Sequence, residues 1–166
     1  MRSFPHFALV AAGLLVLACR GSATPEPTPG TAPAAIVLET VLQRSLPGQA
    51  GGEIREVARD EASWKALWDR LREGGGDVLP TEPPAIDFKK DMVLAAAMPT
   101  QSCVSKVTLR GIVRSGGELV VNLLEAPPAP NCTCFVSERP IHVVRLPRSA
   151  DPVRFEAERG VTPCGR

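Results

Sequence analysis

Hydrophobic and polar positions follow short, regular patterns along most of the chain. Alternating or β-branched runs at 36–44, 53–58, 104–114, 118–125, 134–146 and 151–158 predict strands. The run 91–98 is continuously apolar, which predicts a central strand buried on both faces. Ser115-Gly116-Gly117 separates two of these runs and indicates a tight hairpin. We expect a second hairpin between 36–44 and 53–58, across a turn rich in glycine.

One stretch, 60–72, has the period of an amphipathic helix. Trp64, Leu67, Trp68 and Leu71 fall at i, i+3, i+4 and i+7, which forms one apolar stripe. Asp60 is placed to cap the first turn. The stripe favours a helix seated on a sheet, and a ligand platform made by the two tryptophans is the alternative. The pattern predicts an α+β fold, a mainly antiparallel β-sheet domain with one amphipathic helix packed on it.

The N-terminus has the layout of a bacterial lipoprotein signal. Arg2 precedes twelve apolar or small residues, 7–18, which are too few to span a bilayer. The segment ends in Val16-Leu17-Ala18-Cys19, which resembles a lipobox. We therefore expect residues 1–18 to be a signal peptide that is removed, and Cys19 to carry lipid that anchors the chain in a membrane. An ordinary secretory signal with an incidental Cys19 is the alternative.

Residues 19–35 predict a tether, and 36–166 a single folded domain. Four prolines among threonine, glycine and alanine in 21–35 cannot bury enough surface to fold. Arg20 follows the lipidation cysteine, where inner-membrane lipoproteins of Gram-negative cells usually carry Asp. By this analogy we expect an outer-membrane anchor, with the domain on the periplasmic or the cell-surface side.

Charge and composition argue against nucleic-acid binding, and cysteine usage indicates disulfides. The formal net charge is +1 at pH 7 and no basic stripe is present. Beyond Cys19, four cysteines remain in an exported chain: Cys103, Cys132, Cys134 and Cys164. Cys132 and Cys134 are unlikely partners for each other, because alternate residues of a strand stand roughly 6.5–7 Å apart, beyond the common Cα spacing of a disulfide. We expect Cys103 to bond one of them, Cys132 slightly ahead of Cys134, and Cys164 to bond the other.

The Cys132-Thr133-Cys134 pattern offers the one local hint of chemistry. On a strand the two cysteines share a face, so a redox or metal-handling site is the alternative to structural disulfides. His142 is the sole imidazole after the signal and lies in an apolar run, where a hydrogen-bonded histidine in the core or on a sheet face is the favoured interpretation. No nucleophile–base pairing stands out. We expect no catalytic residue, no metal and no cofactor.

Several short segments follow one another in a recognisable order: 64–68 and 84–88, the apolar run 92–97, Pro99-Thr100 leading into 104–113, then 118–124 and 140–147. In this order and spacing they resemble the C-terminal domain of PrcB, an accessory subunit of a bacterial surface protease complex. The family often has a Gly-Gly-Tyr-like turn after the Pro-Thr, whereas this chain has Gln101-Ser102-Cys103. The resemblance implies stabilisation of a partner protein and no known catalytic residues.

These observations predict a non-enzymatic binding or stabilising module that is anchored to a membrane and acts on an extracytoplasmic protein, with a secreted protease as one candidate partner. The predicted contact surface is a set of loops at one end of the sheet, 99–102 and 127–131, stiffened by disulfides. Its candidate residues are Pro99, Thr100, Gln101, Ser102 and Asn131.

Overall fold

A computed structural model describes residues 36–48, 51–73 and 78–164, all within one compact unit, Ala32–Arg166. The predicted signal peptide, Cys19 and the tether lie outside the described residues. One helix, α1 (Glu61–Arg72), and mostly antiparallel strands make the fold α+β, as predicted. The strands are β1 (Glu39–Pro47), β2 (Ile54–Ala58), β3 (Asp91–Ala97), β4 (Gln101–Ser102), β5 (Lys106–Ser115), β6 (Glu118–Ala126), β7 (Ser137–Pro147) and β8 (Val153–Arg159). No helix among the described residues is long and apolar enough to cross a bilayer.

The strands form two sheets rather than one. The larger sheet has the order β1-β7-β3-β2, and all its pairs are antiparallel. The short strand β4 pairs with the start of β7, on the same side of β7 as β3. The smaller sheet has the order β5-β6-β8, in which the predicted β5–β6 hairpin is antiparallel and β8 lies parallel to β6. The predicted hairpin between β1 and β2 is wrong. β1 pairs with β7 and β2 pairs with β3, because both find longer apolar partners in the central strands.

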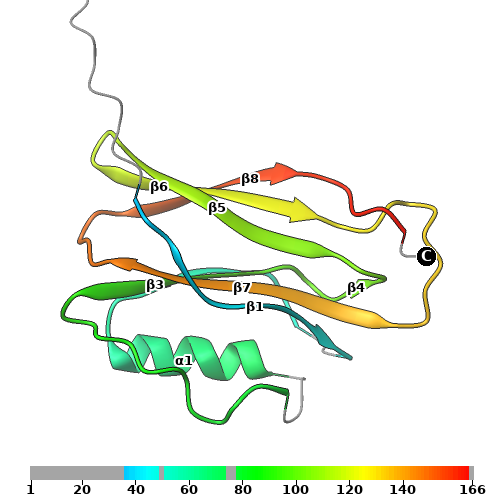
Figure 1. The fold of residues 1–166 in the computed structure, drawn as a ribbon, viewed down its shortest axis with the longest axis horizontal. Coiled ribbons are helices and arrows are strands. Elements are labelled where there is room, and N and C mark those ends of the chain that lie inside the picture. Colours follow the sequence, from blue (N-terminus) through cyan, green and yellow to red (C-terminus); the bar gives the residue numbers. More distant parts are fainter. Residues whose placement is uncertain (1–35, 49–50, 74–77, 165–166) are drawn as a thin grey trace, which may run out of the picture. The chain divides into compact units, whose positions relative to one another are not determined.

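Helix α1 covers one face of the larger sheet, and the smaller sheet covers the other face (Figure 1). β3 therefore has two buried faces, as its unbroken apolar run predicts. Val93, Ala95 and Ala97 pack on the helix side. The alternate residues pack against the smaller sheet: Met92, Leu94 and Ala96.

The helix begins as the sequence predicts. Asp60 is its N-cap and accepts the backbone N–H of Ser63 at 2.7 Å, which lowers the pKa of the Asp60 carboxyl. Trp64 and Trp68 are buried, with 2% and 1% of their surface exposed, so the core interpretation of the stripe is confirmed over the ligand platform. Their indole N–H groups donate to the carbonyls of Pro84 and Pro80, both at 2.9 Å. The proline-rich loop thus closes over the helix and satisfies both indoles.

The last turn of α1 rests on a buried cation. Arg139 of β7 is 2% exposed, and its guanidinium donates to the carbonyl of Arg70 at 3.3 Å and to that of Gly52 at 2.9 Å. Burial lowers the pKa of Arg139. The guanidinium meets the negative end of the helix dipole, which favours a cation there. It also lies directly over Gly51, where an added Cβ would be 2.5 Å from the Arg139 Cζ.

Candidate functional site

Two disulfides hold together the loops at one end of the domain. Cys103 bonds Cys134 with a Cα–Cα distance of 5.1 Å, and Cys132 bonds Cys164 with a distance of 5.3 Å. The prediction that these four cysteines pair, and that Cys132 and Cys134 take different partners, is confirmed. The slight preference for Cys103–Cys132 is wrong.

Backbone pairing explains which cysteine Cys103 takes. Gln101 pairs with Glu138 and Ser102 with Ser137, and the same register continues as the N–H of Cys103 donates to the carbonyl of Val136 at 3.0 Å. This ladder sets Cys103 close to Cys134. Cys132 instead meets the C-terminal tail, because that tail runs beside the loop 127–132 through a bridge between Pro128 and Thr162. The loop length that favoured Cys132 mattered less than strand register.

An exposed apolar patch lies beside the Cys103–Cys134 bond. Phe135 is fully exposed, at 103%, and Val136 and Val104 are 54% and 48% exposed. Val104 directly follows Cys103, and Phe135 and Val136 directly follow Cys134, so the disulfide and the hydrogen bond from Cys103 to Val136 restrain the backbone next to all three. We name Val104, Phe135 and Val136 the Phe135 patch. Such a gathering of exposed apolar side chains marks an interaction site more often than a lone exposed valine does.

Sequence reasoning missed Phe135, because 134–146 was interpreted as one strand. β7 begins only at Ser137, so residues 134–136 precede it and their side chains need not alternate between the core and solvent. An aromatic residue directly after a cysteine of a Cys-x-Cys pair was the available signal. A disulfide fixes the backbone there, and a fixed loop can present a large side chain without burying it.

The predicted contact residues lie at the same end of the domain. Pro99, Ser102 and Asn131 are exposed, and Thr100 and Gln101 are partly buried. The backbone N–H of Thr100 donates to the Gly51 carbonyl at 3.4 Å, and the Gln101 side chain donates to the Pro99 carbonyl at 3.1 Å. The segment 99–102 is therefore tied to Gly51 through Thr100 and to β7 through the pairing of Gln101 and Ser102.

A hollow of about 240 Å³ opens between the two sheets at this end. Met98, Pro99 and Pro127 form its apolar wall, and Glu53, Gln101 and Arg159 line the rest with Glu125. The Glu125 carboxylate is buried and accepts from the Arg55 guanidinium at 2.5 Å, which joins β6 of one sheet to β2 of the other. The loop end therefore combines a hollow with mixed charge and a protruding apolar patch.

His142 is a core histidine, as the sequence favours. It is 3% exposed, its Nδ1 accepts the backbone N–H of Leu109 at 2.8 Å, and its Nε2 lies 3.2 Å from the Thr40 hydroxyl. Burial, reinforced by the positive charge of Lys106, lowers the pKa of His142. A neutral ring with both nitrogens engaged is not poised to accept a proton from a nucleophile.

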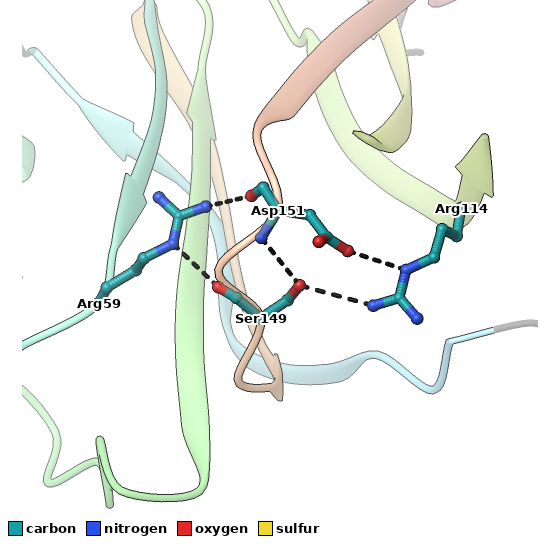
Figure 2. A network of polar contacts seen from close by, with 4 residues as sticks. All are labelled: Arg59, Arg114, Ser149 and Asp151. Atoms are coloured by element: carbon teal, nitrogen blue, oxygen red, sulfur yellow. Dashed lines mark hydrogen bonds and ion pairs between the residues drawn. The ribbon is translucent and has the colours of Figure 1, made fainter. Parts of the chain in front are cut away.

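A polar network ties the two sheets together at the opposite end (Figure 2). Arg59, just before α1, donates to the carbonyls of Ser149 and Asp151 at 3.1 and 2.7 Å. Arg114 of β5 pairs with the Asp151 carboxylate at 2.8 Å and approaches the Ser149 hydroxyl at 3.5 Å. The network joins the β7–β8 loop to both sheets. The Ser149 hydroxyl contacts the Arg114 guanidinium and the Asp151 backbone N–H rather than a base, so the geometry of the network is that of a structural contact.

The cysteines and the acidic residues form no metal-ligand cluster in the part of the chain that the structure describes. The fold and the site together define an α+β domain with a cross-linked, apolar loop end. No family model, no curated protein and no solved structure matches the chain.

Proposed function

We propose that this chain is a membrane-anchored extracytoplasmic lipoprotein that acts as a non-enzymatic binding module for a partner protein. The observation that carries the proposal is the full exposure of Phe135 on a loop held by a disulfide. An exposed aromatic ring costs solvation free energy that burial in a partner's pocket would recover. Aromatic residues at the centre of an interface commonly dominate its binding free energy.

Rigidity adds to this argument. Because the Cys103–Cys134 disulfide and the hydrogen bond from Cys103 to Val136 restrain the backbone at the Phe135 patch, binding costs less conformational entropy than it would on a free loop. The residues predicted to contact the partner, Pro99 to Ser102 and Asn131, lie at the same end of the domain and include polar side chains of the kind that form the rim of an interface. The resemblance to the PrcB C-terminal domain is consistent with a stabilising role, and a secreted protease is one candidate partner.

Position along β7 also supports the proposal. Glu39, at the start of β1, pairs with Arg145, whereas β4 pairs with Ser137 and Glu138. Residues 137 and 145 are eight positions apart, or about 26 Å at roughly 3.3 Å per residue. A chain anchored through Cys19 would therefore enter the domain far from the Phe135 patch, which leaves the patch accessible to an extracytoplasmic protein.

Site-specific photocrosslinking tests the proposal in intact cells. Benzoylphenylalanine replaces Phe135 in one variant and Val37, which is 79% exposed near the start of β1, in the matched control. We expect a discrete crosslinked protein from position 135 and none from position 37. Phe135→Ser should abolish co-purification of that protein, whereas Val37→Ser should not. Equal crosslinking from both positions, or none from position 135, would contradict the proposal.

The redox or metal-handling alternative built on Cys132 and Cys134 is separated by a thiol titration. Each of the two cysteines has a different disulfide partner. The binding module requires no free thiol in the denatured, unreduced protein. Two or more free thiols would favour the redox alternative.

A further inference from the structure

A cavity of about 260 Å³ lies between the end of β1 and the start of β5. It is lined by 43–45 of β1, by 105–107 around the start of β5, and by 140–141 of β7. β1 and β5 are edge strands of the two sheets, and the cavity opens to solvent between them. Arg44 and Lys106 are among the lining residues, and no acidic residue of the described ranges joins them. The cavity is therefore polar, with a surplus of positive charge.

Ser105 brings an unused hydroxyl to this cavity. The residue is 4% exposed, and its Oγ is buried without a hydrogen-bond partner among the described residues. A buried hydroxyl that makes no hydrogen bond is costly, and such a group in a folded protein usually has a partner. Because Ser105 lines the cavity, an occupant that carries an acceptor atom can supply that partner.

Lys106 indicates which kind of acceptor the cavity favours. The Lys106 ammonium has no ion pair within the described ranges, and its positive charge lowers the pKa of His142. The Arg44 guanidinium is already engaged, because it donates to the Val78 carbonyl at 3.3 Å. A lysine without a counter-ion next to an unpaired hydroxyl favours an anion over a water molecule.

Gln43 and Ser45 add donors from β1. These residues are two positions apart on one strand, so their side chains lie on the same face. That face is turned toward β5, because the Gln43 amide donates to the Thr108 hydroxyl at 3.4 Å. The amide nitrogen keeps a second N–H, and the Ser45 hydroxyl makes no hydrogen bond to another described residue.

The backbone of β5 supplies one more donor. The N–H of Leu109 points away from β6, since it donates to His142 at 2.8 Å. Alternate residues of an antiparallel strand direct their N–H groups the same way, and no bulge interrupts 106–109. The N–H of Val107 therefore also points away from β6, on the side of β5 that borders the cavity.

We infer that this cavity binds a phosphate group. The Lys106 ammonium supplies the charge, and the hydrogen bonds come from Ser105, Ser45, Gln43 and the N–H of Val107. Together these donors outnumber the roughly four hydrogen bonds that a carboxylate accepts, whereas the oxygens of a phosphate group accept more. A lysine also binds phosphate as a point charge, without the planar fork that suits a carboxylate. The site goes beyond the proposed function and uses none of the residues of the Phe135 patch.

Two substitutions remove these contacts without breaking a contact of the folded chain. Ser105→Ala deletes a hydroxyl that has no partner, so the melting temperature without phosphate should stay the same or rise. Lys106→Gln removes an exposed charge that has no ion pair within the described ranges. Ser115→Ala, at the other end of β5, and Lys89→Gln are the matched controls, because both side chains are exposed and lie outside the cavity.

The probe is inorganic phosphate, titrated into the purified full chain in detergent at low ionic strength and followed by calorimetry. We expect binding that weakens about tenfold or more in Ser105→Ala and in Lys106→Gln, since a hydrogen bond to a charged group contributes about that much. Binding should stay within about twofold in both controls and in Phe135→Ser. In NMR spectra, the amide signal of Val107 should move as phosphate is added.

A second probe identifies the source of the phosphate group. Glycerophosphoglycerol is a phosphodiester with the chemistry of a lipid headgroup, whereas inorganic phosphate represents a soluble ligand. We expect inorganic phosphate to bind more tightly, because a diester carries less charge and fewer free oxygens. Tighter binding of the diester would instead assign the cavity to a lipid headgroup.

Three results would overturn the inference. No binding at about 10 mM phosphate would mean that water alone occupies the cavity. Binding that Ser105→Ala leaves unchanged would be an adventitious contact with the lysine. Acetate that binds as tightly as phosphate would show that the donors do not select a phosphate group.

Discussion

The imidazole Nδ1 of His142 accepts the backbone N–H of Leu109 at 2.8 Å, and so joins β7 of one sheet to the edge of β5 in the other. The same ring contacts Thr40 of β1 through Nε2. Since Leu109 points this N–H away from β6, the histidine occupies a position that a neighbouring strand would otherwise take. One side chain thus fixes the spacing of three strands.

Replacing this side chain should destabilise the domain measurably. His142→Leu keeps the volume but leaves the Leu109 N–H unpaired in a buried site, so we expect a loss of about 1–3 kcal/mol in the free energy of unfolding. Denaturant unfolding measures it. Gln43→Ala removes the nearby exposed hydrogen bond from the Gln43 amide to the Thr108 hydroxyl, and it should change the free energy of unfolding by less than about 0.5 kcal/mol. Equal losses in the two variants would show that His142 contributes no more than a surface contact.

The stability of the domain should also fall in mild acid. Burial lowers the pKa of His142 below its ordinary value of 6.5, so the unfolded chain takes up the proton first. The stability that the neutral ring contributes is therefore fully present well above pH 6.5. It declines as the pH falls through that value toward the pKa of His142 in the folded domain. His6, the other histidine, lies in the predicted signal peptide. His142→Leu should flatten the pH dependence near pH 6, and an unchanged profile would contradict this assignment.

Trp68 should be a determinant of stability rather than of binding. It is 1% exposed and its indole N–H is bonded to Pro80, so Trp68→Ala opens a cavity and removes that bond. We expect a loss of about 3–5 kcal/mol. Thermal unfolding measures it. A variant that keeps its melting temperature but loses a ligand would revive the platform hypothesis.

Gly51 and Gly52 should respond differently to the same substitution. A Cβ at Gly51 would lie 2.5 Å from the Arg139 Cζ, whereas one at Gly52 meets nothing within 4 Å. Gly51→Ala displaces a buried guanidinium from the Arg70 and Gly52 carbonyls to which it donates, and we expect a cost of about 1–3 kcal/mol. Gly52→Ala should be close to neutral. Matching melting temperatures for the two variants would mean that Arg139 moves aside freely.

Anchoring depends on one atom, the sulfur of Cys19, if the lipobox is used. Cys19→Ser should release the domain into the soluble extracytoplasmic fraction or leave an uncleaved precursor, because lipid is the predicted attachment. Fractionation followed by mass spectrometry of the N-terminal peptide distinguishes these outcomes. A processed variant that stays firmly on the membrane would reveal another anchor.

Local patterns predicted the elements well. Periodicity located α1 and its Asp60 cap, unbroken apolarity identified β3 as central, and the glycine turn identified the β5–β6 hairpin. Each of these features depends on residues that are near one another in sequence. The register of β4 on β7, which decides the disulfide pairing, joins residues more than thirty positions apart and left no local trace.

The candidate site was only partly predictable for a related reason. The loop end and its stiffening by disulfides follow from turn residues and cysteine spacing. The exposure of Phe135 depends on β7 beginning only at Ser137, whereas the sequence predicts one extended run over 134–146. The sequence likewise suggested one sheet rather than two. The parallel pairing of β8 with β6 requires the chain to leave the smaller sheet and return to it, and this return depends on residues far apart in sequence.

That excursion has a consequence for the order in which the chain can fold. β7 lies between β1 and β3 and begins at Ser137, and β8 completes the smaller sheet only after it. Synthesis from the N-terminus therefore leaves the larger sheet without its central strand until most of the chain has been made. If the chain is exported as proposed while it is being made, the late synthesis of β7 disfavours folding before export.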